Sequence, residues 1–246
     1  MSQMISVSEA LKTLLSKETK VVVLTGAGIS AESGVPTFRG EDGLWKKFRP
    51  EELATFDAFM ANPELVWEWY EYRRKIIEEI KPNPAHLALV EFQNHFEEFD
   101  LITQNVDGLH NQAGSKNVVE LHGNIKRNKC IRCGAQYETL EKTIKGIPPK
   151  CPCGGNVRPD VVWFGEMLPQ DALNYAFKVS SDCDLFFSVG TSAVVHPAAS
   201  LPLIAKRSGA YVVEVNIEPT EISHVIDESL IGKAGKIMPQ LVKFFM

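Results

Sequence analysis

Four short apolar runs recur along the chain with helical patterns between them, and this alternation constrains the fold more than any other feature. The runs are Val21–Thr25, Asp100–Gln104, Asp184–Val189 and Tyr211–Val215. Continuous runs rich in β-branched and aromatic residues are typical of strands buried on both faces, as in a parallel sheet. Helical patterns precede the last three runs, over residues 84–98, 169–180 and 197–208. The sequence therefore predicts an α/β fold, a Rossmann-like doubly wound parallel sheet.

Two stretches interrupt this rhythm. Residues 38–82 carry many aromatic residues at helical spacing, which predicts a helical insertion. Residues 126–158 hold four of the five cysteines, which predicts a small zinc-binding module. The remaining segments are then expected to form one nucleotide-binding domain, over residues 1–37, 83–125 and 159–246.

The four cysteines form two tight pairs that predict a zinc ribbon. Cys130 and Cys133 are spaced C-x-x-C, and Cys151 and Cys153 are spaced C-x-C. Four thiolates around one ion leave no ligand position open, so such a site is structural rather than catalytic. Two pairs of ordinary thiols, or a disulfide pair in a secreted protein, are the alternative. The start of the chain lacks the pattern of a secretory signal and Cys183 has no obvious partner, which disfavours that alternative.

The charge and hydropathy of the chain exclude some partners. A formal net charge of −5 gives no support for a general nucleic-acid-binding protein, which is usually basic. No apolar run reaches the length that spans a bilayer. We therefore expect a cytoplasmic protein with no direct nucleic-acid partner and no membrane partner.

A glycine-rich turn follows the first apolar run. Gly26, Ala27 and Gly28 come directly after Thr25. Glycine at two of these positions lets the backbone turn sharply and approach a pyrophosphate, which the N-terminus of the next helix stabilises. The acidic residue that usually holds the ribose at the end of a second strand is not evident, so the ribose is expected to be held differently from that in a standard dehydrogenase.

The polar, glycine-rich segment that follows holds Phe38 beside Arg39. An aromatic lid and a cation are the side chains that a loop over a bound phosphate would need. A plain surface loop is the alternative, and these residues alone leave both interpretations open.

Further motifs follow in a fixed order along the chain. They are Gly26–Ser30, Gly34–Gly40, Thr103–His110, Leu121–Gly123, the two cysteine pairs, Arg158–Glu166, Gly190–Ser192 and Val215–Asn216. Each motif is weak alone, but the ordered set resembles the sirtuin family of NAD-dependent protein lysine deacylases. A Rossmann-like domain with a zinc ribbon and a helical insertion is also the architecture of that family.

The resemblance implies NAD-dependent removal of acyl groups from protein lysines, giving nicotinamide, free lysine and O-acyl-ADP-ribose. It implies NAD and one structural zinc ion as cofactors, and acyl-lysine proteins or peptides as partners. His122 matches the family's general base, since a neutral imidazole can take a proton from a ribose hydroxyl near neutral pH. A lone histidine is more often a satisfied core residue, and we keep that interpretation for the other five histidines, which are His86, His95, His110, His196 and His224.

The resemblance also implies which residues contact NAD and the peptide. Asn105 and Asp107 match residues of the nicotinamide pocket, where Asp107 would accept the carboxamide N–H groups. Val162 and Phe164 match a strand that pairs edge to edge with the substrate peptide and walls the lysine tunnel. The implied NAD contacts are Gly26, Ala27, Gly28, Phe38, Arg39, Trp45, Gln104, Asn105, Val106, Asp107, Gly190, Thr191, Ser192, Asn216, Ile217, Glu218 and Ala234.

One pair of residues bears on the choice of acyl group. Tyr70 and Arg73 are three residues apart on a predicted helix and share one of its faces. The pair resembles that of the sirtuins that remove succinyl and malonyl groups, because a phenol and a guanidinium can bind a distal carboxylate. An amphipathic aromatic helix with a solvated arginine pair is the alternative.

Three rival functions differ in their products. A dehydrogenase would transfer a hydride and reduce NAD(P), but the chain lacks the usual ribose acid. A zinc-ribbon nucleic-acid module would not need the glycine-rich turn and does not fit the net charge. Mono-ADP-ribosyl transfer to protein lies within the same family, and the sequence alone leaves it open.

Overall fold

The computed structural model describes residues 5–37, 50–138 and 146–246 of the chain. Its larger sheet has six strands, each parallel to its neighbours. In spatial order they are β3 (Val119–Glu120), β2 (Glu98–Thr103), β1 (Lys20–Thr25), β7 (Leu185–Val189), β8 (Tyr211–Asn216) and β9 (Glu228–Ile231). Counted along the chain within this sheet, this is the order of a doubly wound Rossmann sheet, which reverses between β1 and β7. The predicted fold class is confirmed.

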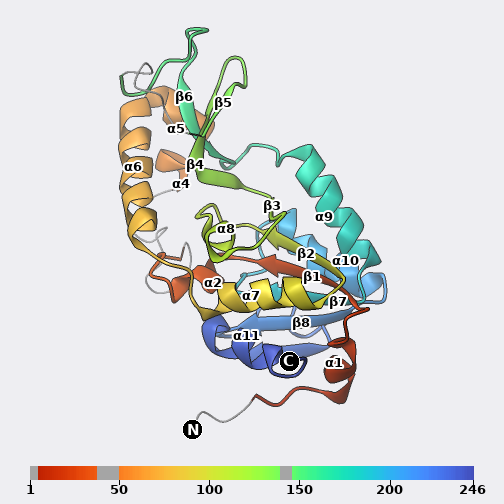
Figure 1. Cartoon of the computed structure of the whole chain (residues 1–246). Helices are drawn as coiled ribbons and strands as arrows, with labels where there is room; N and C mark the ends of the chain where they lie inside the picture. The colour runs from red at the N-terminus through yellow and green to blue at the C-terminus, as the bar shows by residue number, and fades with distance from the viewer. Residues whose placement is uncertain (1–4, 38–49, 139–145) are drawn as a thin grey trace.

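Helices cover both faces of this sheet (Figure 1). Successive side chains of β1 point to opposite faces. Val21 and Val23 belong to the core shared with α7 and α11, and Val22 and Leu24 belong to the core shared with α9 and α10. The helices around the sheet are α1 (Glu9–Leu14), α2 (Ala27–Ala31), α7 (Pro84–His95), α8 (Leu109–Ala113), α9 (Gln170–Asp182), η1 (Ala198–Ser200), α10 (Leu201–Arg207) and α11 (Ala234–Val242).

The start of α7 shows how local sequence sets a helix boundary. Asn83 caps the helix by accepting a hydrogen bond from the N–H of Ala85, and Pro84 occupies the first turn, where a missing N–H costs nothing. The imidazole of His86 accepts from the N–H of Asn83 and completes the cap. The helix ends at His95, earlier than the predicted residue 98, because Phe96 takes an extended conformation that leads into β2.

The two stretches that interrupt the α/β rhythm form one small unit beside the main sheet (Figure 1). Helix α6 packs against a three-stranded sheet with the spatial order β5-β4-β6, and Trp67, Tyr70 and Trp163 lie in their common core. The elements of this small unit are α4 (Pro50–Leu53), α5 (Phe56–Ala61), α6 (Pro63–Glu79), β4 (Gly123–Cys130), β5 (Gln136–Tyr137) and β6 (Val157–Val161). The domain boundaries given above stay a prediction.

One predicted strand is absent. The segment Val162–Glu166, expected to be a strand, has no strand in the structure, because β6 ends at Val161. Phe164 forms only a single bridge with Thr55. Among the helices that the structure describes, none is long and apolar enough to cross a membrane.

Candidate active site

Two glycine-rich turns meet at the carboxyl ends of β1 and β7, where the strand order reverses. The N–H of Gly28 donates to the carbonyl of Gly190 at 2.8 Å, and the N–H of Gly26 donates to the carbonyl of Val189 at 3.0 Å. A Cβ atom on Gly28 would lie 2.7 Å from the Cα atom of Gly190, so backbone packs directly on backbone. Doubly wound sheets bind their ligands in the crevice at this reversal.

A cavity of about 990 Å³ opens at these turns and extends to the small unit. This volume lies at the upper end of the range for small-molecule sites. Most of the predicted site residues line it, namely Gly26, Ala27, Gly28, Tyr70, Arg73, Gln104, Asn105, Val106, His122, Val162, Phe164, Gly190, Thr191, Ser192, Asn216, Ile217, Glu218 and Ala234. Phe38, Arg39 and Trp45 lie outside the described residues.

His122 is held at the cavity with a defined tautomer. Its Nδ1 atom lies 2.9 Å from the carbonyl oxygen of Gln104. A carbonyl can only accept, so Nδ1 carries the hydrogen and Nε2 of the neutral ring is an acceptor. Burial lowers the pKa of His122, which favours the neutral form.

The backbone around His122 is equally constrained. Gly123 has a φ of +77°, and a Cβ atom there would lie 2.1 Å from the carbonyl oxygen of Asp160, so no other residue fits. The carbonyl of His122 accepts from the N–H of Val162 at 2.9 Å. His122 therefore lies between the main sheet and the small unit, with its imidazole bonded to Gln104 after β2 and its backbone bonded to Val162 after β6.

At the other end of the cavity, aromatic and cationic side chains from α6 form the wall. Tyr70 is 1% exposed and Arg73 is 8% exposed, and both line the cavity. The Arg73 guanidinium lies 4.8 Å from the ring centroid of Trp69 and 5.8 Å from that of Tyr70. The predicted pair thus shares a buried helix face, not a solvated one. Burial raises the pKa of Tyr70, so its hydroxyl stays protonated at neutral pH.

Asp107 lies behind the cavity wall rather than in it. Its carboxylate accepts from the hydroxyl of Ser30 at 2.8 Å and from the N–H of Leu109 at 2.9 Å. Burial raises its pKa despite these bonds. The amide of Asn105 donates to the same Ser30 hydroxyl at 3.2 Å and to the carbonyl of Gly26 at 3.1 Å. Asp107 therefore orders the polar wall that Asn105 presents, and its predicted contact with a carboxamide stays a prediction.

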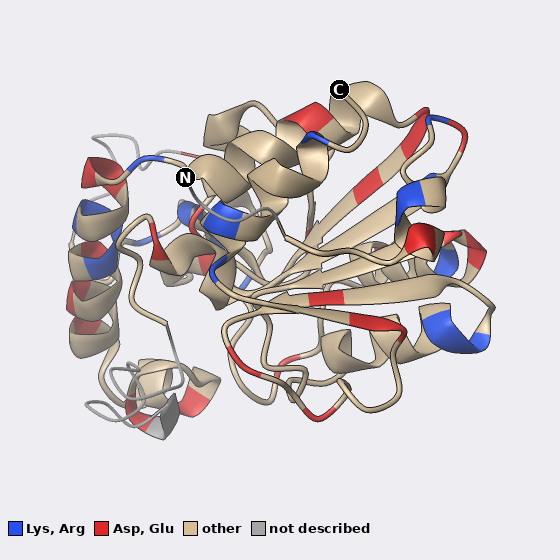
Figure 2. Cartoon of the chain, turned by 90° about the horizontal axis from the view of Figure 1, so that it is seen from below, with Lys and Arg blue, Asp and Glu red and all other residues tan. Residues whose placement is uncertain are grey.

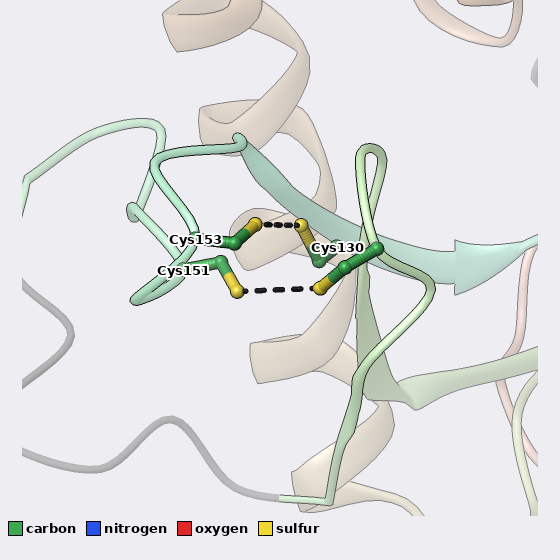
Figure 3. A group of neighbouring side chains, drawn as sticks. Cys130, Cys151 and Cys153 are labelled. Carbon is green, nitrogen blue, oxygen red and sulfur yellow. Dashed lines mark hydrogen bonds between the residues drawn. The ribbon is translucent and has the colours of Figure 1, made fainter.

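Four thiols converge at the far end of the small unit. Figure 3 shows the sulfur atoms of Cys130, at the end of β4, and of Cys151 and Cys153, in the segment before β6, pointing toward a common region. The sulfur atoms of Cys130 and Cys153 are 3.5 Å apart, those of Cys133 and Cys151 are 3.6 Å apart, and all four lie within 4.8 Å of one another. Tetrahedral zinc with thiolates at about 2.3 Å places its sulfur atoms about 3.8 Å apart. The four thiols fit one structural zinc ion.

The Sir2 family model matches residues 26–197 of the chain. The chain belongs to the Sir2 family. NAD-dependent protein deacylase 1 of Caldanaerobacter subterraneus subsp. tengcongensis is 59% identical over 214 residues, covering 87% of this chain and 88% of that protein. NAD-dependent protein deacylase of Aquifex aeolicus is 56% identical over 216 residues, covering 87% and 90%.

Solved structures of Sir2 proteins have the same fold as this chain. A Sir2 homologue in complex with NAD aligns with a TM-score of 0.88 at 46% identity, covering 99% of this chain and 95% of that one. A Sir2 complex with a p53 peptide and NAD+ aligns with a TM-score of 0.81 at 36% identity, covering 96% and 97%.

This Sir2-family chain also uses residues that the sequence did not single out. Ser30 joins Asn105 to Asp107, and in the sequence it is only the last residue of the glycine-rich motif. Trp163 lines the cavity and contacts Tyr70. His86 and His110 lie in the core, as expected, and burial lowers their pKa values to about 4 and about 3. His95 is half-buried. The core interpretation is wrong for His196 and His224, which are exposed, and His196 lines the cavity.

The surface of this Sir2-family chain carries charges of both signs. Figure 2 shows Lys and Arg interspersed with Asp and Glu on the side that faces the viewer. This distribution agrees with the net charge of −5 and gives no support for the nucleic-acid module.

Proposed function

We propose that this chain is an NAD-dependent protein lysine deacylase that removes acetyl groups, and succinyl or malonyl groups, from lysine side chains. The relatives that carry this activity in their names are more than half identical to the chain over most of its length. The observation that carries the proposal is the position of His122, whose Nε2 acceptor belongs to a cavity that also holds the two glycine turns and the Tyr70–Arg73 pair.

NAD, when bound, supplies a ribose carbon that the acyl oxygen can attack as nicotinamide leaves. The turn at the N-terminus of α2 lines the cavity, and its glycines would let the backbone approach the pyrophosphate closely. Asn105, fixed by Gly26 and Ser30, lines the part of the cavity next to that turn. Such a site works by positioning and by fixed dipoles in a water-poor cleft.

His122 is the general base. Its Nε2 atom accepts a proton from a ribose hydroxyl, and the carbonyl of Gln104 stabilises the imidazolium that forms through the Nδ1 hydrogen. The side chain of Gln104 donates to the hydroxyl of Thr191 at 3.0 Å, so Gln104 links His122 to the turn after β7.

The substrate is an acyl-lysine in a peptide or protein. A Sir2 relative has been solved with a p53 peptide, which supports a peptide partner. Val162 and Phe164 flank the cavity next to His122, and the N–H of Phe164 donates to the carbonyl of Ala54 at 2.9 Å. We propose that the peptide backbone lies along this segment and inserts the acyl-lysine toward Tyr70.

Product analysis tests this function. The protein is incubated with NAD and either acetyl-lysine or succinyl-lysine peptide, and all products are identified by mass spectrometry. Deacylation gives equal amounts of nicotinamide, free lysine peptide and O-acyl-ADP-ribose. ADP-ribose attached to peptide would indicate the transferase instead, and formation of NADH would indicate a dehydrogenase.

A further inference from the structure

The side chain of Trp163 is hydrogen-bonded to Tyr70, at the end of the cavity where we propose that the acyl group binds. Its indole N–H donates to the hydroxyl oxygen of Tyr70 at 2.8 Å. Both residues line the cavity, and Trp163 is 2% exposed. An indole nitrogen can only donate, so the Tyr70 oxygen is the acceptor.

This bond decides where the Tyr70 hydrogen can point. A phenol has one hydrogen, and it cannot be donated back to an indole N–H. Among the described residues, none accepts a hydrogen bond from this hydroxyl. The hydrogen is therefore available to a ligand in the cavity. A hydroxyl that already accepts one hydrogen bond is also a stronger donor of the next.

Trp163 is itself fixed on two sides. The guanidinium of Arg158 lies 3.2 Å from the centroid of the indole ring. Arg158 is paired with Glu166, whose carboxylate also accepts from the backbone N–H of Trp163 at 2.8 Å. Ring and backbone are held by the same ion pair, so the indole N–H has a fixed direction.

Arg73 supplies the charge at this end of the cavity. Its guanidinium is buried among aromatic rings, where its attraction for an anion is screened little by water. An acetyl group offers no charge to it, whereas a succinyl or malonyl group ends in a carboxylate. A carboxylate has two oxygens, so it can take a hydrogen bond from Tyr70 as well as from Arg73.

We propose that Trp163 is a specificity-determining positioning residue, which orients the Tyr70 hydroxyl toward the distal carboxylate of an acidic acyl group and so favours succinyl-lysine and malonyl-lysine over acetyl-lysine. This inference rests on the proposed deacylase function. Trp163 acts through Tyr70 and does not itself contact the reacting atoms.

Two matched tryptophan variants test this role. Trp67 lies in the same core, donates its indole N–H to the carbonyl of Val157 at 2.9 Å and has the Arg74 guanidinium 5.3 Å from its ring, but it does not line the cavity. Trp163→Phe should lower the ratio of kcat/KM for succinyl-lysine peptide to that for acetyl-lysine peptide by roughly 5-fold, because one hydrogen bond contributes about 1 kcal/mol. Trp67→Phe should lower stability and leave the ratio within about twofold of wild type.

The same change in a Tyr70→Phe background separates positioning from general damage. Without the phenol there is no hydrogen to orient, so adding Trp163→Phe should not lower the ratio further. An equal fall in both backgrounds, or an equal fall for Trp67→Phe, would overturn the proposal. Wild-type protein that acts on acetyl-lysine but not on succinyl-lysine would also overturn it and leave the deacylase function standing. Absence of nicotinamide release with every acyl peptide would overturn both.

Discussion

At the scale of single residues, the hydrogen bond from His122 to the carbonyl of Gln104 gives a prediction for the pH dependence of turnover. The base must be neutral, and burial lowers its pKa below the usual value of about 6.5. The neutral form therefore persists to more acidic pH than that of a free imidazole. We expect kcat/KM to fall on the acid side with a midpoint below pH ~6.5, measured as nicotinamide release across a pH series.

The variant His122→Ala provides the control for this prediction. It should lower turnover by about 10²–10⁴-fold and abolish that acid limb, while NAD binding measured by calorimetry persists. An acid limb that survives in His122→Ala would assign the titration to another group.

Arg73 gives a second residue-scale prediction. Arg73→Met keeps much of the apolar stem but removes the guanidinium from the buried face of α6. Loss of one charged hydrogen-bonding partner costs about 1.5–3 kcal/mol, so we expect desuccinylation efficiency to fall by roughly 10- to 150-fold. Deacetylation should change little, because an acetyl group has no carboxylate.

Parallel kinetics on the two peptides checks the Arg73 prediction. Equal losses on both would indicate that Arg73 supports the fold or the NAD site, and the chain would then be an ordinary deacetylase.

Sequence reasoning reached some of these residues because their chemistry is local. Gly26 and Gly28 stand in a short motif whose spacing indicates a turn, and the ordered motifs that resemble the sirtuin family indicate the role of His122. Tyr70 and Trp163 are 93 residues apart in the sequence, and no local sequence pattern predicts their contact. For Asp107 the motif predicts a contact with a carboxamide, and the structure adds a hydrogen bond from Ser30 that the sequence did not indicate.

At the scale of elements, β8 carries a buried carboxylate that shapes the cavity wall. Glu214 is 1% exposed, and its carboxylate accepts from the hydroxyls of Thr220, Ser223 and Ser229. Residues 216–221, which follow the strand, line the cavity. Glu214 thus holds the loop after β8, which contains the predicted NAD contacts Asn216, Ile217 and Glu218, against the cavity.

Glu214→Gln should therefore weaken NAD binding without altering the chemistry. The amide offers one acceptor oxygen in place of two, and a net loss of about 1 kcal/mol raises KM for NAD roughly 5-fold with kcat little changed. Glu228→Gln is the matched control on β9, because Glu228 accepts from the hydroxyls of Ser8 and Tyr211 and does not line the cavity. The same rise in KM in both variants would contradict the prediction.

Elements were predictable where burial sets the pattern. The runs Val21–Thr25, Asp184–Val189 and Tyr211–Val215 are rich in apolar residues, and they coincide with strands that are buried on both faces, the second of which begins at Leu185. The segment after β6 is also apolar, but it is not a strand. Its N–H groups bond to single partners on two other segments, Val162 to His122 and Phe164 to Ala54, instead of one neighbouring strand. The conformation of residues 162–166 depends on contacts with segments distant in sequence, which the spacing of apolar residues does not indicate.

At the scale of the whole molecule, the chain has separate cores that meet at the cavity. The main sheet has its own core on each face, and the small unit has a third, in which Cys130 and Cys151 pack with Tyr70 and Trp163. The sequence indicated the main sheet through its alternation. It indicated the helical insertion and the cysteine stretch as two modules, and their shared core depends on contacts between α6 and β6 that only the fold reveals.

Because the cores are separate, we expect metal loss to destabilise the small unit and to leave the main sheet largely intact. Four closed thiol ligands hold the end of the small unit, and metal binding free energy is coupled to folding. Chelation, or Cys153→Ala, should lower metal content and loosen the wall at Tyr70, while the glycine turns keep the support of the main sheet. A loss of about 3 kcal/mol would lower Tm by roughly 6–12 °C. We expect acyl-peptide binding to weaken far more than ADP-ribose binding, both measured by calorimetry on the same samples.

Cys183→Ala removes a buried thiol outside the cluster and should leave metal content unchanged. Metal-depleted protein that retains its Tm and its acyl-peptide affinity would mean that the thiol cluster does not brace the cavity.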